Sequence, residues 1–352
     1  MAAAPDISII LPVYQAVLTL DACLRSLESQ ESADIEIVCV DDGSTDGSAA
    51  VLAEHAASDA RVRVITQENA GVSVARNVGL GAARGRIIMF IDADDRMLPG
   101  AFKRVLEAFD AGRSDGVEAV AFGARCEPEE AAPKHVRNLL SPAACVLRRG
   151  ADGYADPDLL FCANAQPYIW RLAVSRDLLE REGILFTPGL ALGEDAVFMF
   201  AVYATARATA LIPDKLYGYR MEAASATHQF NAEGAAARKL GEHLRAQRAI
   251  LEDWRVRGLL SWCPGRMITW CLDFLLFDIA RLPETGQREW VAQAADLMAE
   301  FFGDGWTELP ANVVVRRTAR KVAAGYARFS KAGLVLFFIA TRGLRQCVER
   351  FI

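Results

Sequence analysis

The sequence predicts an α/β fold in which a mostly parallel sheet is flanked by helices, followed by a smaller α-helical domain. Short apolar runs alternate with helical patterns over the first 122 residues, and a polar motif follows most of these runs. From about residue 232 the pattern becomes wholly helical. A chain of 352 residues, 52% of them apolar, is consistent with two domains. We expect domains at residues 1–230 and 231–352.

The strands and helices of the first domain follow from this alternation. Apolar runs predict strands at residues 7–11, 35–40, 62–65, 87–91 and 117–122, and helical spacing predicts helices at residues 19–30, 46–57 and 72–84. This rhythm is typical of parallel βαβ units with right-handed crossovers. The segment from Glu127 to Asp158 is interrupted by prolines, which include Pro128, Pro133 and Pro142, so we expect mainly loop there with a little helix.

The second domain is predicted from stripes of apolar residues at helical spacing. One stripe is formed by Leu240, Leu244, Leu251 and Trp254, and another by Trp290, Ala294, Leu297 and Phe301. Between them, Trp270, Phe274 and Phe277 lie in a run that is apolar nearly all round. A helix of that composition is expected to be buried.

Charge is distributed unevenly along the chain. The net charge of −6 is ordinary and gives no indication of nucleic-acid binding. From Asn312 to Ile352, however, nine basic residues face one acidic residue, so this tail carries +8 and the preceding part −14. A basic tail on an acidic body indicates contact with an anionic partner.

The tail contains an apolar stretch, residues 334–340, with basic residues on both sides. These flanking residues are Arg328, Lys331, Arg342 and Arg345. A basic amphipathic segment of this kind lies on anionic membrane surfaces, which would suit a lipid-linked acceptor. Alternatively, it is a last helix whose apolar face packs on the helical domain.

The eight cysteines form no C-x-x-C pair, so no disulfide framework or zinc site is predicted. The first residues lack the basic start of a secretory signal. The longest uncharged stretch, residues 7–20, is interrupted by Pro12 and is shorter than the ~20 residues of a spanning helix. We expect a cytoplasmic protein, peripheral on the inner face of the membrane if the tail binds there.

Three carboxylates follow the strand predicted at residues 87–91, in the motif Asp92-Ala93-Asp94-Asp95. If the backbone stays extended, Asp92 and Asp94 share one face and Asp95 points away. Two carboxylates at the open end of a strand suit a hard cation such as Mg²⁺ or Mn²⁺, completed by substrate phosphates. The alternative is an acidic turn that caps the next helix.

Asp41 and Asp42 end another predicted strand. A carboxylate there can accept a hydrogen bond from the N–H of a nucleobase, and Tyr14, after the first strand, can stack on the same ring. Alternatively, Asp-Gly-Ser is ordinary turn chemistry. Arg76, one turn into the third helix, either meets a phosphate or the base or is a solvated helix residue.

Four of these motifs together resemble glycosyltransferase family 2. They are residues 9–14 (IILPVY), 40–46 (VDDGSTD), 68–77 (ENAGVSVARN) and 90–95 (FIDADD), and the resemblance extends more loosely to about residue 225. It implies a Rossmann-like GT-A fold, nucleotide-diphosphate sugar donors with UDP-sugars favoured, inversion at the anomeric centre, and a role in bacterial cell-surface polysaccharide synthesis. It places Pro12, Tyr14, Asp42, Arg76 and Asp92 at the nucleotide, and Asp94 with Asp92 or Asp95 at the metal.

The second half contributes Glu194-Asp195, which resembles the acidic motif whose Asp takes the acceptor proton. A positioned carboxylate helps a poorly nucleophilic hydroxyl, an effect of about 10²–10⁴-fold in rate. Alternatively, the pair caps a helix predicted over 196–206 through its dipole. The resemblance also places Trp170 beside the acceptor, and Arg220 or His228 near the diphosphate; a core Trp and a structural His are the alternatives.

The predicted activity is therefore transfer of a sugar from a nucleotide-diphosphate sugar to a hydroxyl of a glycan or lipid-linked glycan, with Asp195 as base and Glu194 beside it. A non-catalytic binding module on the same fold is an alternative. The presence of Asp42, Asp92, Asp94 and Asp195 argues against it, because a degenerate copy could lose these residues without penalty. A sugar nucleotidyltransferase would carry a Gly-rich basic loop near the first strand, and residues 12–20 contain none.

Overall fold

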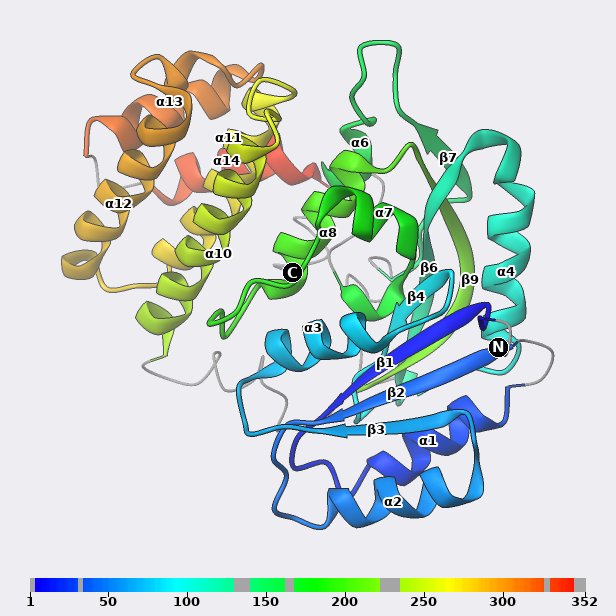
Figure 1. Cartoon of the computed structure of the whole chain (residues 1–352). Helices are drawn as coiled ribbons and strands as arrows, with labels where there is room; N and C mark the ends of the chain where they lie inside the picture. The colour runs from blue at the N-terminus through cyan, green and yellow to red at the C-terminus, as the bar shows by residue number, and fades with distance from the viewer. Residues whose placement is uncertain are drawn as a thin grey trace. The chain divides into compact units, whose positions relative to one another are not determined.

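A computed structural model describes residues 4–30, 34–129, 140–161, 168–221, 235–325 and 330–344. The chain divides into two compact units. Unit 1 comprises Met1–Gly189 and Glu194–Met221, and unit 2 comprises Leu190–Gly193 and Glu222–Ile352. The boundary predicted near residue 230 lies outside the described residues. Figure 1 shows the elements of both units.

Unit 1 is built on a nine-stranded sheet with the order β3-β2-β1-β4-β8-β6-β9-β5, and β7 also pairs with β9. The strands are β1 (Ile7–Val13), β2 (Ile35–Asp41), β3 (Val62–Thr66), β4 (Ile87–Phe90), β5 (Arg96–Met97), β6 (Val117–Glu127), β7 (Cys145–Arg148), β8 (Leu172–Ser175) and β9 (Ala208–Arg220). All five predicted strands are present. The first four are parallel neighbours, as expected for βαβ units.

Two features of the sheet differ from the prediction. β8 inserts between β4 and β6 and runs antiparallel to both. Its two partner strands are distant from it in the sequence, so local periodicity does not predict this pairing. The segment expected to be loop contains β7, which pairs with β9. Its residues, Cys145 to Arg148, are only partly buried or exposed, and so they lack the continuous apolar pattern of a central strand.

β1 continues past Pro12, although a proline was expected to end it. The carbonyl of Ile10 accepts a hydrogen bond from Ile91, so residues of this parity face β4. The β4 pairing ends at Ile10, and Pro12 therefore lies where no ladder partner needs its missing N–H. The strand can then run on to Val13, which accepts a hydrogen bond from the backbone of Asp42.

Helices cover both faces of the sheet. The helices that precede β8 are α1 (Leu20–Glu28), α2 (Ser48–Ser58), α3 (Val72–Ala82), α4 (Ala101–Ala111) and α6 (Asp158–Phe161), and those that follow it in unit 1 are α7 (Arg176–Glu182) and α8 (Glu194–Thr205). Buried residues of α1, α2 and α4 share one core cluster, and Ala75 of α3 packs on the other face of β2. Figure 1 shows α1 and α2 on one side of β1–β3 and α3 on the other.

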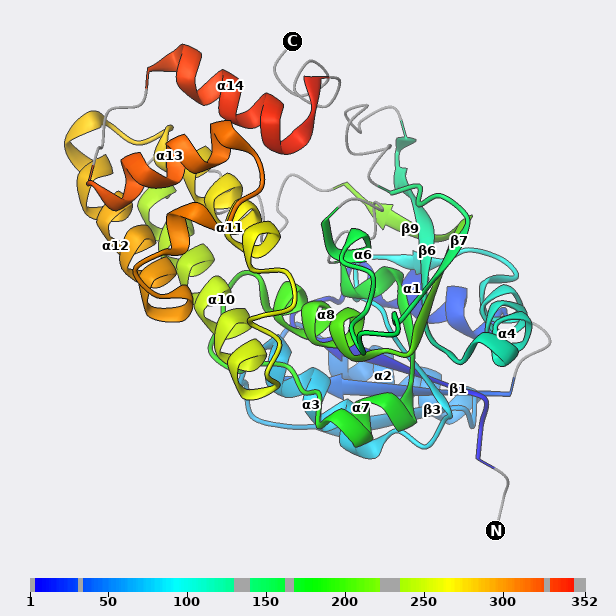
Figure 2. The ribbon, with the colours of Figure 1, turned by 90° about the horizontal axis from the view of Figure 1, so that it is seen from above.

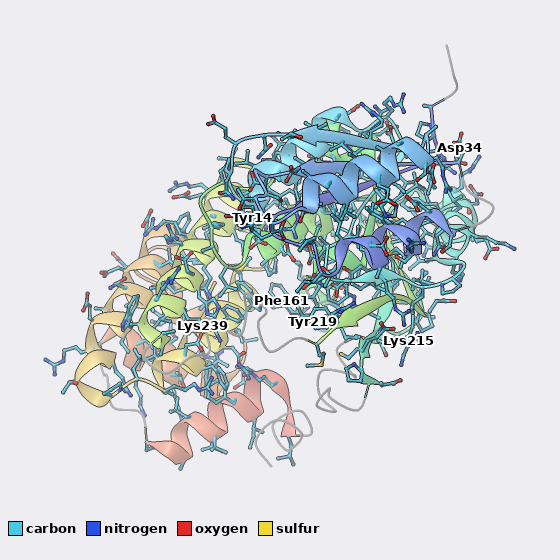
Figure 3. The ribbon with its side chains drawn as sticks, turned by 90° about the horizontal axis from the view of Figure 1, so that it is seen from below. Tyr14, Asp34, Phe161, Lys215, Tyr219 and Lys239 are labelled. Carbon is cyan, nitrogen blue, oxygen red and sulfur yellow. The ribbon has the colours of Figure 1, made fainter. Side chains whose placement is uncertain are left out.

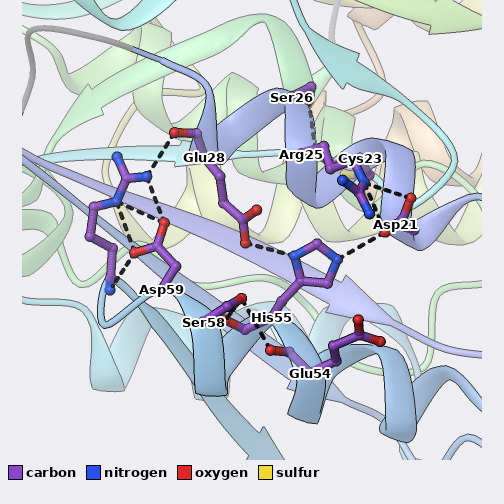
Figure 4. A network of polar contacts seen from close by, with 10 residues as sticks. Asp21, Cys23, Arg25, Ser26, Glu28, Glu54, His55, Ser58 and Asp59 are labelled. Atoms are coloured by element: carbon purple, nitrogen blue, oxygen red, sulfur yellow. Dashed lines mark hydrogen bonds and ion pairs between the residues drawn. The ribbon is translucent and has the colours of Figure 1, made fainter.

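α1 and α2 are joined by a polar network around His55, which is shown in Figure 4. Nδ1 of His55 lies 2.7 Å from Glu28 and Nε2 lies 3.2 Å from Asp21. Since both ring nitrogens face carboxylate oxygens, the imidazole bridges two turns of α1. The network lies beneath the sheet and plays a structural part.

Unit 2 is helical in its described part. Its helices are α10 (Ala236–Val256), α11 (Pro264–Ile279), α12 (Glu284–Phe302), α13 (Val313–Ala323) and α14 (Lys331–Arg342), and Figure 2 shows α13 and α14 side by side. α11 buries Met267, Cys271 and Leu275, but Trp270, Phe274 and Phe277 remain partly exposed. The prediction that this helix is buried is therefore wrong for the side that carries Trp270, Phe274 and Phe277. Among the described residues, no helix is long and apolar enough to cross a membrane.

Candidate active site

The loop after β1 presents Tyr14 at the carboxyl end of the parallel strands. Figure 3 labels Tyr14 and Asp34, which lie at opposite ends of this part of the sheet. Tyr14 is 54% exposed, and Pro12 is partly buried just before it. Gln15 has a φ of 52°, a left-handed conformation that is strained for a residue other than glycine.

The motif after β2 holds this loop in place. The side chain of Gln15 contacts Thr45, Ser48 accepts a hydrogen bond from Ala16 (2.9 Å), and Asp46 accepts one from Val17 (3.0 Å). A hydrogen bond from the hydroxyl of Ser48 (2.6 Å), with smaller effects from the N–H groups of Val17 and Ser48, lowers the pKa of Asp46 and keeps it ionised. The DDGSTDGS sequence therefore fixes the position from which Tyr14 extends.

Asp42 is buried and organises a neighbouring loop. Its Oδ1 accepts hydrogen bonds from Gln67 (2.7 Å) and from the N–H of Ala70 (2.8 Å), and its Oδ2 accepts one from the N–H of Gly71 (2.9 Å). Gly71 has a φ of 90°, which only glycine adopts without strain. Asp42 is predicted to accept a hydrogen bond from a nucleobase, but in the structure both of its carboxylate oxygens accept hydrogen bonds from residues of this protein.

The acidic motif after β4 forms a turn. The N–H of Asp95 donates to the carbonyl of Asp92 over 3.1 Å, so the backbone does not stay extended after β4. Asp92 and Asp94 are both partly exposed. Asp95 is buried, because its Oδ2 accepts a hydrogen bond from the hydroxyl of Tyr217 (2.7 Å) and its Oδ1 one from the backbone of Arg220 (2.7 Å).

Burial, together with the negative charges of Asp92 and Asp94, raises the pKa of Asp95 to about 8, although the two hydrogen bonds act in the opposite direction. The same hydroxyl of Tyr217 accepts a hydrogen bond from the N–H of Asp92 (3.2 Å). Tyr217 therefore contacts both ends of the acidic turn, and no local sequence pattern predicts this role.

Arg76 joins this turn to the start of α8. Its Nη2 donates to Asp92 (3.0 Å), and its Nη1 donates to Glu194 (3.1 Å) and to Asp195 (2.8 Å). The guanidinium group lies 5.1 Å from the ring centroid of Phe186. Desolvation acts against the charge of Arg76, but the attraction of three carboxylates keeps its pKa above the ordinary value.

Glu194 and Asp195 begin α8, where the helix dipole favours negative charge. The pKa of Asp195 is raised to about 8, chiefly by burial; Arg76 opposes this rise, and the charges of Glu194 and Asp92 add to it. Its Oδ2 accepts a hydrogen bond from the N–H of Ile169 (3.2 Å). A carboxylate with a pKa near neutrality is suited to proton transfer.

Trp170 is 4% exposed and lies within a stack of aromatic rings. Its ring centroid is 5.1 Å from that of Tyr168, 4.5 Å from that of Tyr217 and 5.4 Å from that of Tyr219. Tyr168 and Tyr219 are more exposed than Trp170, so these residues present the accessible surface of the stack. The Tyr217-Gly218-Tyr219 alternation was the signal, since period two puts both rings on one face.

Two predicted site residues remain, Arg220, whose backbone N–H donates to Asp95 of the acidic turn, and His228. Arg220 is the last residue of β9 and is partly buried. His228 lies outside the described residues. Asn77 received no predicted role, yet its side chain makes two hydrogen bonds to the backbone of Phe186, each 2.9 Å long.

The acidic turn offers the oxygen ligands that a divalent cation requires. In the described ranges, no three His, Cys, Asp or Glu side chains are placed to hold a metal ion together. Asp92 and Asp94 are nonetheless partly exposed carboxylates on one turn, close enough to Asp95 to raise its pKa. That donor set fits a cation completed by phosphate oxygens rather than an all-protein cage.

This sheet, with carboxylates from β4 and α8 meeting at Arg76, defines a GT-A fold of the kind found in sugar transferases. The model of the family "Glycosyl transferase family 2" matches residues 8–159. The Bacillus subtilis protein named uncharacterized glycosyltransferase EpsJ is 31% identical over 263 residues, which cover 74% of this chain and 72% of EpsJ. The chain belongs to glycosyltransferase family 2 and is a glycosyltransferase.

Other relatives agree with this membership. The succinoglycan biosynthesis protein ExoO of Rhizobium meliloti is 28% identical over 262 residues, 72% of this chain and 70% of ExoO. The crystal structure of Staphylococcus aureus TarS 1–349 in complex with UDP has a TM-score of 0.69 at 16% identity, covering 94% of this chain and 90% of that one. The likeness to TarS supports the fold.

Proposed function

We propose that this glycosyltransferase moves a sugar from a nucleotide-diphosphate donor to a hydroxyl of a glycan or lipid-linked glycan, with inversion and the help of a divalent cation. The observation that carries the proposal is the convergence of Asp92, Glu194 and Asp195 on Arg76. The guanidinium group of Arg76 thereby pairs both with Asp92, the carboxylate on the donor side, and with Asp195, the candidate catalytic base. The relationship to a succinoglycan biosynthesis protein supports a role in polysaccharide synthesis.

In this mechanism Asp195 takes the proton of the acceptor hydroxyl as its oxygen attacks the anomeric carbon. The bond between that carbon and the diphosphate oxygen breaks, and its electron pair leaves with the diphosphate. Attack opposite the leaving group gives inversion. Asp195 is held by Ile169 and Arg76, so its orientation is fixed before the acceptor arrives.

Asp94 and Asp92 would hold Mg²⁺ or Mn²⁺, with Asp95 supporting the turn from beneath. When bound, the cation would neutralise charge that develops on the departing diphosphate, an effect of several kcal/mol. Tyr14, exposed beside Pro12, would stack on the nucleobase. Asp42 would contribute by holding the loop at residues 69–71.

A thermal-shift screen tests the donor assignment. UDP, GDP, CDP and dTDP are added with and without Mn²⁺; UDP is the favoured candidate, and TarS, which shares the fold, was crystallised with UDP and with UDP-GlcNAc. Stabilisation by one diphosphate only when Mn²⁺ is present supports the proposal, and Asp94→Ala should remove that metal dependence. Equal melting temperatures under all conditions would contradict it.

For the acceptor side we propose contact with an anionic membrane through α14. This helix buries Phe337 and Phe338 yet leaves Val335 and Leu336 56% and 58% exposed. Its last residue, Arg342, pairs with Asp273 and ties the inner face to α11. The basic excess of the tail is complementary to acidic lipid headgroups.

Sedimentation with vesicles tests this contact. The wild type should pellet with vesicles of phosphatidylglycerol and phosphatidylcholine but not with phosphatidylcholine alone, and Val335→Glu with Leu336→Glu should abolish pelleting. Val313→Glu, which alters another exposed apolar residue, serves as the control. Equal pelleting of all three proteins, or a dimer that the double substitution breaks without vesicle binding, would contradict membrane contact.

A further inference from the structure

The side chain of Arg76 is 3% exposed, which is unusual for a residue expected at a nucleotide. Its two terminal nitrogens donate to three carboxylates that come from two distant parts of unit 1, the turn after β4 and the first turn of α8. A phosphate could approach this guanidinium only by displacing carboxylates that already hold it. Burial and pairing therefore favour a role within the protein framework.

An aromatic cluster supports the guanidinium from below. Phe186 lies under it, and the Phe186 ring is stacked 4.3 Å from that of Phe198 on α8 and lies edge-on 5.2 Å from that of Phe90 on β4. The cluster thus ties together the same two elements that Arg76 bridges through charge. Close-packed aromatic rings permit little sliding of one element past another.

The neighbouring residue completes the support. Asn77 donates to the carbonyl of Phe186 and accepts a hydrogen bond from its N–H, both at 2.9 Å. Two consecutive residues of α3 therefore contact Phe186: Asn77 holds its backbone, and Arg76 lies over its ring.

We infer that Arg76 is the positioning residue that holds Asp195 at a fixed place relative to Asp92. Its planar fork reaches the donor-side carboxylate with one nitrogen and the base with the other, a geometry that lysine does not reproduce. This inference rests on the proposed role of Asp195 as base. It gives Arg76 the role of holding the catalytic base Asp195 rather than of binding the nucleotide.

The charged groups that face Asp195 are Arg76 from α3, Asp92 from the turn after β4, and Glu194 from α8 itself. Arg76 is the one cation among them in the described part of the chain, and it opposes the effects of burial and of the two carboxylates. Loosening its contact should therefore leave Asp195 harder to ionise. A change in the pH profile would report this, whereas simple loss of packing would not produce one.

The test compares Arg76→Lys with Arg63→Lys, a matched control. Arg63 pairs with Glu36 (2.9 Å), a carboxylate outside the Arg76 cluster. Transfer is measured as kcat across pH, and affinity for UDP, or for the diphosphate selected by the screen, is measured by calorimetry with Mn²⁺. For Arg76→Lys we expect kcat to fall at least ~10-fold, within the range for a misplaced base. Its acid limb should move to higher pH, with affinity unchanged.

Loss of diphosphate affinity with kcat preserved would overturn the inference in favour of a nucleotide contact. A profile identical to that of Arg63→Lys would overturn it as well. If Arg76→Lys does not fold, Phe186→Leu replaces it, because this change removes the ring beneath the guanidinium and should shift the pH profile in the same direction.

A second readout separates this inference from the proposed function. Carboxyl ¹³C signals of labelled aspartates are titrated by NMR, with Asp195 assigned through Asp195→Asn. In Arg76→Lys the Asp195 signal should titrate at higher pH than in the wild type, even if no donor supports transfer. An unchanged titration would refute the positioning role, whereas failure of the wild type to transfer any sugar would refute only the proposed function.

Discussion

Arg76 donates a hydrogen bond of 2.8 Å to Asp195 across 119 positions of sequence. This contact joins α3 to the first turn of α8. Through the same guanidinium group, Asp195 is linked to Asp92 at the end of β4. The candidate base and the acidic turn are thus parts of one charged cluster.

The raised pKa values of Asp95 and Asp195 predict how stability depends on pH. Both rise from 3.8 to about 8, so the folded protein holds protons that the unfolded chain releases between those values. Their stabilising contribution is complete below about pH 4 and is lost as pH rises toward 8, at no more than ~1.4 kcal/mol per pH unit for each proton.

Urea unfolding at pH 6 and pH 9, with a chelator present, measures this loss. Asp195→Asn should reduce the difference in unfolding free energy between the two pH values, because Asn does not titrate, while the contribution of Asp95 remains. A difference that is unchanged by the substitution would show that Asp195 ionises normally.

Asp42→Asn should weaken the loop at residues 69–71. An amide group can accept from only one of the two backbone N–H groups of Ala70 and Gly71 and places its own hydrogens against the other. We expect a loss of about 1–3 kcal/mol in unfolding free energy, the usual result of an unsatisfied buried donor. Urea unfolding measures it.

Asp214→Asn is the matched control for this change, since Asp214 forms a partly exposed ion pair with Arg104. Such pairs contribute about 0–1 kcal/mol. Equal losses for the two variants would refute the special role of Asp42.

Tyr217→Phe should loosen the acidic turn. The substitution removes the hydroxyl that donates to Asp95 and accepts from the N–H of Asp92, while the ring can still stack on Trp170. We expect destabilisation by about 1–2 kcal/mol and weaker Mn²⁺-dependent binding of the diphosphate. Tyr203→Phe is a control, because Tyr203 is also fully buried but its hydroxyl oxygen has no partner among the described residues. Equal losses of stability and of diphosphate binding in the two variants would contradict the role of the Tyr217 hydroxyl in holding the acidic turn.

The parallel part of the sheet is predictable from the sequence because β1, β2 and β4 are mainly apolar runs, and β3, whose burial alternates, lies in the same rhythm of strands and short helical crossovers. The sequence also places the carboxylates of Asp92 and Asp195 at the ends of their elements. Periodicity did not reveal β7, whose residues are only partly buried, nor the insertion of β8 between β4 and β6. Both depend on contacts between distant segments.

The sequence predicts which residues belong to the candidate site, but it does not predict which of them contact one another. Asp95 is buried while Asp92 and Asp94 are partly exposed, but a turn produces this difference, and strand alternation gives no signal for the turn. Likewise, Arg76 was expected near the nucleotide, and no local pattern indicates that its partners would be Glu194 and Asp195. Long-range ion pairs leave no periodic signal in a sequence.

Asp195→Asn tests the central claim most directly. In the presence of Mn²⁺, sugar transfer and diphosphate binding are measured side by side for this variant, for Glu194→Gln and for the wild type. The proposed role predicts that Asp195→Asn loses about 10²–10⁴-fold in transfer rate while it binds the diphosphate as the wild type does. Undiminished transfer by Asp195→Asn would contradict the assignment of Asp195 as the base.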